Sequence, residues 1–71
     1  MYVYRTKVGD FSIVPQGGRW HTLFQEEILG SYDSPQQAAF DLSVGHTFPP
    51  PGDVETSRLG IPKDLSGWEA G

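Results

Sequence analysis

The sequence predicts an α+β fold, in which a three-stranded antiparallel meander is covered on one face by one helix. Up to residue 32, short β-prone segments alternate with turn signals, which is typical of consecutive antiparallel strands. A well-capped helical segment follows at residues 34–45. After Gly45 the chain is rich in proline and then regains spaced large apolar residues, which indicates a tail that folds back over the core.

The strands are predicted from β-prone residues that lie between turn signals. Tyr2-Val3-Tyr4 offers an additional N-terminal strand, with Gly9-Asp10 as the turn that follows it. The meander consists, in order, of strand 11–14, hairpin connection 15–18, strand 19–24, polar turn 25–27 and strand 28–32. Both faces of its middle strand carry apolar groups, so either can point inward. These faces are Trp20, Thr22 and Phe24 on one side and Arg19, His21 and Leu23 on the other.

The start of the helix carries several agreeing signals. Ser34 is a good N-cap, Pro35 occupies the first helical position, and Gln37 has the spacing of a capping box. Gly45 is the expected C-terminal stop. The apolar face of the helix consists of Ala38, Ala39 and Leu42. The expected structural centre combines this face with the sheet aromatics Phe11, Trp20, Phe24 and Tyr32.

The domain organisation follows from the change in composition after Gly45. Residues 1–45 are expected to form a β-β-β-α core domain, and residues 46–71 a proline-rich tail that wraps it within the same single domain. The three prolines 49–51 favour an extended polyproline conformation. Beyond them, Ile61, Leu65 and Trp68 are spaced so that they can cover an exposed part of the core.

Composition excludes several classes of protein. The chain has 71 residues and no cysteine, so disulfides and thiolate-held zinc or iron–sulfur sites are ruled out. It shows neither a signal-peptide pattern nor an apolar run near the roughly 20 residues of a membrane span. We therefore expect a cytoplasmic protein with no membrane partner. The net charge is −4, and residues 21–71 hold eight of the nine carboxylates, which disfavours a general attraction to polyanions.

Five residues near the N-terminus form the one candidate binding face: Arg5, Lys7, Arg19, Trp20 and His21. Basic and aromatic side chains of this kind contact phosphates and stack on bases in nucleic-acid-binding proteins. The competing interpretation, which we favour, makes Trp20 a core residue of a domain that has few core residues. The two imidazoles, His21 and His46, have no ligand or triad spacing around them, so we expect no catalytic, metal or cofactor site.

Most of the chain resembles a set of small uncharacterised bacterial proteins, which implies a bacterial origin and brings no function with it. The resemblance rests on the pattern Gly9-x-Phe11-x-Ile13, Gly18-Arg19-Trp20, Leu29-Gly30-x-Tyr32-x-Ser34-Pro35-x-x-Ala38-Ala39-x-Asp41-Leu42 and Gly45-x-Thr47. It continues in the tail as Ile61-Pro62-x-Asp64-Leu65-x-x-Trp68-Glu69.

A looser resemblance concerns the meander and the helix alone. Trp20, Leu29-Gly30-Ser31-Tyr32, Ser34-Pro35 and Ala38-Ala39 are similar to the APETALA/ethylene-response DNA-binding domain of plants and phages. There a three-stranded sheet lies in the major groove and a helix packs behind it, so the resemblance implies a β-β-β-α scaffold. The sheet of that family carries several arginines and tryptophans, whereas residues 11–32 here offer one of each and add Glu26 and Glu27.

These observations favour a small non-enzymatic interaction module that binds another protein through its exposed sheet face or edge. The alternative is a nucleic-acid-binding module that uses the sheet face. The scaffold resemblance favours the alternative, and the acidic second half of the chain opposes it. Protein binding predicts an exposed apolar patch on the sheet, and nucleic-acid binding predicts a basic one.

Overall fold

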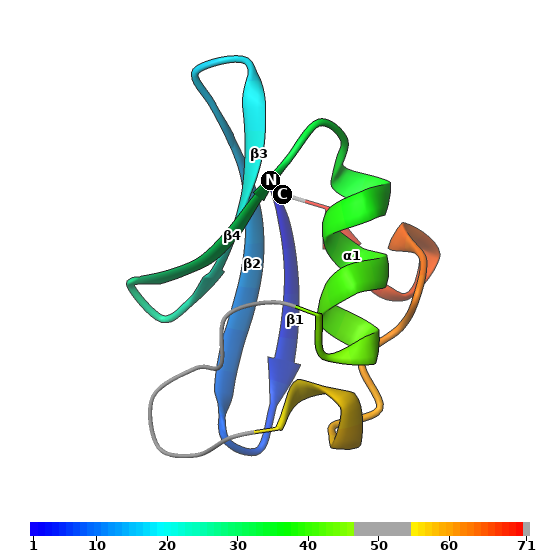
Figure 1. The fold of residues 1–71 in the computed structure, drawn as a ribbon. Coiled ribbons are helices and arrows are strands. Elements are labelled where there is room, and N and C mark those ends of the chain that lie inside the picture. The colour runs from blue at the N-terminus through cyan, green and yellow to red at the C-terminus, as the bar shows by residue number, and fades with distance from the viewer. Residues whose placement is uncertain (47–54, 71) are drawn as a thin grey trace.

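The computed structural model describes residues 1–46 and 55–70. In this part of the chain, five antiparallel strands form one sheet, and one helix packs against one of its faces. The α+β prediction is confirmed. The strands are β1 (Tyr2–Thr6), β2 (Gly9–Gln16), β3 (Arg19–Phe24), β4 (Glu27–Tyr32) and β5 (Glu69–Ala70). Their order across the sheet is β4-β3-β2-β1-β5, and helix α1 (Pro35–Val44) lies across the inner face (Figure 1).

The predicted N-terminal strand exists and extends the meander to four strands, but the turn after it lies two residues earlier than expected. Residues 7–8 form the turn, and Gly9 already belongs to β2. The next connection is also shorter than predicted, because β2 runs through Pro15 and only Gly17-Gly18 turns, both with positive φ. Pro15 is tolerated in a strand here because β1 begins with Tyr2 opposite Ile13, so its pairing with β2 does not reach Pro15 and no described strand needs an N–H donor on that side.

The core lies between the inner face of the sheet, α1 and the tail. Thr22 and Phe24 are buried, which identifies their side of β3 as the inward one. Phe11 and Phe24 pack with ring centroids 4.6 Å apart, as expected for the structural centre. The buried apolar residues are Phe11, Ile13, Phe24, Leu29, Ala38, Ala39, Leu42, Ile61 and Trp68. Trp20 and Tyr32 are only partly buried and pack against this core.

Both ends of α1 are capped as the sequence predicts. Ser34 Oγ accepts a hydrogen bond from the backbone N–H of Gln37 at 3.2 Å. The side-chain amide nitrogen of Gln37 donates to Asp41 Oδ1, one turn further along the helix, at 2.8 Å. Gly45 ends the helix in the left-handed conformation, with φ of 80°. Helix α1 is too short to cross a membrane, and no other described segment forms a longer apolar helix.

The tail returns to the sheet, as predicted. It forms two short 3-10 helices, η1 (Thr56–Arg58) and η2 (Leu65–Gly67), before β5 pairs with β1. Ile61 and Trp68 are buried, and the indole of Trp68 donates to the carbonyl of Pro62 at 3.3 Å. Strand β5 was not expected, and it brings the two termini together (Figure 1). The polyproline prediction for residues 49–51 lies outside the described residues.

Candidate binding surfaces

The face of the sheet that points away from α1 is here called the outer face. Strand alternation and register place its residues in cross-strand rows. One row contains Val3, Ser12, Leu23 and Ile28, and the next contains Val14, His21 and Ser31. In the described part of the chain, the helix and the returning tail lie on the other side of the sheet (Figure 1). No described element therefore covers the outer face over these rows.

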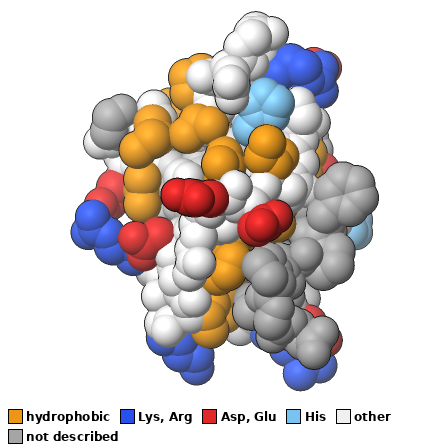
Figure 2. All heavy atoms as spheres, turned by 90° about the vertical axis from the view of Figure 1, so that its left-hand side faces the viewer, with side chains coloured by type: hydrophobic (Ala, Val, Ile, Leu, Met, Phe, Trp, Pro, Cys, Tyr) orange, Lys and Arg blue, Asp and Glu red, His pale blue; other side chains and the backbone are white. Residues whose placement is uncertain are grey.

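Aliphatic side chains gather on the outer face. Val3, Val14 and Leu23 are half-buried, and Ile28 at the edge is 59% exposed. A hollow of about 460 Å³ adjoins them, lined by Met1, Val3, Gly9, Asp10, Ser12 and Gln25. Figure 2 shows hydrophobic side chains grouped on this face beside a histidine. The face thus combines apolar surface with a concave part, as binding surfaces commonly do.

Two carboxylates directly precede Ile28, the exposed member of this apolar group. The β3–β4 turn bends away from α1 and carries Glu26, and Glu27 begins β4; both are exposed (Figure 1). Neither makes an ion pair with a described residue within 4.0 Å. The backbone N–H of Gln25, which has a positive φ of 56°, donates to the carbonyl of Asp10 at 3.2 Å and holds the turn in place. In Figure 2, acidic side chains lie next to the hydrophobic ones.

The five residues of the predicted binding face do not form one surface. Arg19 and His21 lie on the outer face, whereas Trp20 lies between them on the inner face, with its ring centroid 6.0 Å from that of Tyr2. Arg5 points to the outer side at the far end of the sheet. Lys7 lies in the β1–β2 turn. Strand alternation therefore separates the aromatic ring from the cations that were expected beside it.

Arg19 is already occupied by contacts within the protein. Its Nη1 donates to Asp33 Oδ1 at 2.7 Å, and its Nε donates to Ser31 Oγ at 2.8 Å. Its Nη2 also reaches the Ser31 carbonyl at 3.2 Å. The Asp33 carboxylate neutralises the positive charge of the guanidinium. A phosphate would have to displace these bonds before Arg19 could bind it.

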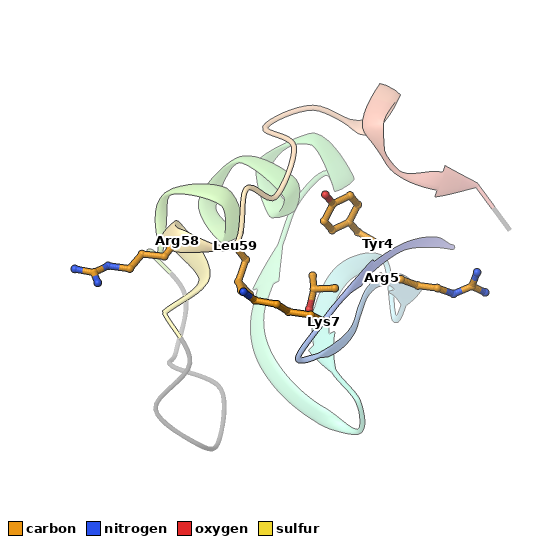
Figure 3. A pocket seen from close by; sticks show the side chains of 6 residues that line it. Tyr4, Arg5, Lys7, Arg58 and Leu59 are labelled. Carbon is orange, nitrogen blue, oxygen red and sulfur yellow. The ribbon is translucent and has the colours of Figure 1, made fainter.

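A second, basic hollow lies at the end of β1 and was not expected from the sequence. It has a volume of about 270 Å³ and is lined by Tyr4, Arg5, Thr6, Lys7, Arg58 and Leu59 (Figure 3). Arg58 reaches it because η1 packs beside α1 and under the end of the sheet. Arg58 is far from Arg5 in the sequence, so the sequence alone did not predict that the two residues line the same hollow.

The titratable groups of the described residues show little sign of a reactive centre. No three His, Asp or Glu side chains among them lie close enough to hold a metal ion. Nδ1 of His21 is buried without a hydrogen-bond partner. Burial, together with the nearby Asp41 carboxylate, raises the pKa of the Tyr32 hydroxyl. Hydrogen bonds from the hydroxyl and the backbone N–H of Ser66 lower the pKa of Asp64, which caps η2.

Comparison with protein-family models, curated proteins and solved structures found no match for this chain. The two family resemblances of the sequence therefore stay expectations. The function is therefore inferred from the chemistry of the outer face and of the basic hollow.

Proposed function

We propose that the protein is a non-enzymatic interaction module that binds another protein through the outer face of its sheet. The observation that carries this proposal is the group of aliphatic side chains at Val3, Val14, Leu23 and Ile28 on a face that no described element covers. Exposed apolar surface of this kind is favourable when a partner removes it from water. The large exposure of Ile28 fits a contact residue better than a structural one.

Charge complementarity indicates what kind of partner fits. Glu26 and Glu27 are exposed, directly precede Ile28 in the chain and have no described cationic partner. A partner surface with an apolar centre and flanking lysine or arginine residues would satisfy both features. We therefore propose a protein segment of that composition as the occupant.

The nucleic-acid alternative has less support from the same residues. Trp20 packs against Tyr2 on the inner face, so it offers no stacking surface beside Arg19 and His21. Arg19 is neutralised by Asp33, and carboxylates stand on the outer face where phosphates would have to lie. Binding through this face would bring like charges together.

The test is a selection of random peptides on the full chain, followed by amide NMR of the chain with the selected peptides. We expect peptides with apolar residues flanked by lysine or arginine, and shifts on Val3, Val14, Leu23 and Ile28. Ile28→Ser should weaken their binding by about tenfold, the effect of losing one well-buried apolar contact. The matched control is Phe40→Ser on α1, since Phe40 is a large apolar residue that is 45% exposed on another surface.

Two outcomes contradict the proposal. One is a selection that yields no binding peptide, or only peptides whose shifts lie away from the outer face. The other is equal weakening by Ile28→Ser and Phe40→Ser, which would indicate general stickiness. Mixed-sequence DNA is titrated in parallel at low and moderate salt. Salt-sensitive shifts on the outer face from DNA alone would favour the alternative.

A further inference from the structure

Three of the five lysine and arginine side chains of the protein line one hollow at the end of β1. Arg5 and Lys7 come from β1 and the turn after it, and Arg58 comes from η1 in the tail. The net charge of the protein is −4, so this gathering of cations runs against its overall composition. We propose that the hollow is a second binding site, which takes an extended acidic peptide segment whose carboxylates contact these cations.

The shape of the hollow suits a chain segment better than a single ion. Its volume is about 270 Å³, and Tyr4 and Leu59 add apolar surface to the lining. In Figure 3, Lys7 extends from the turn in the direction of Leu59, whereas Arg5 and Arg58 point outward to opposite sides. Lys7 is therefore the cation that extends over the hollow, and the guanidinium groups of Arg5 and Arg58 lie outside it on either side.

The three cations differ in how closely carboxylates of the protein already pair with them. Lys7 makes no ion pair with a described residue within 4.0 Å. Arg5 reaches two carboxylates only at 3.7 and 4.0 Å, and both partners are largely exposed. Arg58 pairs at 2.9 Å with Glu55, three residues away on the same turn of chain. Exposed pairs of this kind contribute little to stability, so a ligand carboxylate can replace them at low cost.

A free strand edge beside the hollow points to an extended peptide as the ligand. Strand β5 pairs only with Tyr2 and Val3, so the rest of β1, through Thr6, has no strand on that side among the described residues. An extended peptide can add backbone contacts at such an edge. A single-stranded nucleic acid would need a free aromatic face, whereas the ring of Tyr4 already packs on Trp68, with centroids 5.7 Å apart.

The experiment titrates the full chain with a short fluorescein-labelled oligoglutamate peptide, and follows both anisotropy and amide shifts. We expect shifts on residues 4–7 and 58–59. Lys7→Glu and Arg58→Glu should each weaken binding by about tenfold or more. The matched control is Lys63→Glu, which changes the net charge equally at an exposed position outside the hollow and should weaken binding less than about twofold at moderate salt.

Each contrary result overturns the proposal. If the peptide causes no amide shifts at residues 4–7, it does not bind in the hollow and the proposed site is wrong. Equal weakening by Lys7→Glu and Lys63→Glu reduces it to an effect of net charge. An oligothymidylate that binds the same residues more tightly than the peptide makes it a nucleic-acid site. Because none of these variants touches the outer face, the proposal stands or falls separately from the proposed function.

Discussion

The guanidinium of Arg19 binds the carboxylate of Asp33 at 2.7 Å, and this contact joins the start of β3 to the residue that precedes the N-cap of α1. The same side chain donates two further bonds to Ser31 on β4. The planar fork of arginine makes all three contacts at once, which the single ammonium of lysine does not. Arg19 therefore stabilises the junction between the sheet and the helix.

Arg19→Lys is expected to lower the free energy of unfolding by about 0.5–1 kcal/mol, since the pair is exposed and one cation replaces another. Urea denaturation measures the loss. The control is Arg5→Lys, because Arg5 makes only longer ion pairs, at 3.7 and 4.0 Å, and should change stability less. A double-mutant cycle with Asp33→Ala isolates the contact, and a coupling energy of zero would contradict the assigned role.

Thr22 is fully buried, and its hydroxyl has no hydrogen-bond partner. An unsatisfied buried hydroxyl costs free energy, whereas a methyl group of the same shape does not. Thr22→Val is therefore expected to raise the free energy of unfolding by about 1 kcal/mol. Thermal unfolding checks this, with Ser12→Ala on the outer face of the neighbouring strand as the control. A lower melting temperature for Thr22→Val would mean that the hydroxyl has a partner after all.

The helix is predictable from the sequence because its signals are local. Ser34, Pro35 and Gly45 each act within one helical turn, and the structure confirms all three. The two-residue strand β5 is different, since it pairs with β1 at the end of a tail that the buried Trp68 holds against the core. No window of sequence around Glu69 contains that information.

The candidate binding surfaces likewise depend partly on local sequence signals and partly on long-range contacts. Strand alternation already separates Trp20 from Arg19 and His21 in the sequence, but the choice of the inward face depends on the helix that covers it. In the basic hollow, Arg58 lies close to the end of β1 because the tail returns to the sheet there. Long-range contacts of this kind leave no periodic signal.

Gly30 lies against the aromatic ring of Tyr32, two residues further along β4. A Cβ at this position would lie 2.8 Å from the hydroxyl oxygen of Tyr32. Gly30→Ala should therefore displace the ring and destabilise the protein by about 1–3 kcal/mol. Chemical denaturation measures the change, and Tyr32→Val in the same chain should recover part of it by opening space. A loss that is equal with and without the tyrosine would place the cause in the backbone instead.

The Tyr32 hydroxyl is expected to make the stability of the folded protein fall at alkaline pH. Burial is the main cause that raises its pKa, and Asp41 adds to it, so the folded state holds this proton more tightly than the unfolded state. The resulting stability is fully present below the pKa of unfolded tyrosine, about 10, and is lost as the pH rises through the folded value. Urea denaturation on both sides of that pH should show a smaller alkaline loss for Tyr32→Phe. Tyr2→Phe is the control. If Tyr32→Phe loses as much stability at alkaline pH as the unchanged protein does, another group causes that loss.

Trp68 makes the tail part of the folding unit. It is only 6% exposed, packs on Tyr4 and donates its indole N–H to Pro62. Trp68→Ala should cost about 3–5 kcal/mol, because it removes a large buried side chain and leaves a cavity. A domain of this size has only about 4–10 kcal/mol in total, so the variant should be close to unfolding across the sheet as well as the tail. Amide exchange of β2 and β3 measures this, with Glu69→Ala as the exposed control beside it. Protection of those strands that is unchanged in Trp68→Ala would mean that the tail and the meander unfold independently.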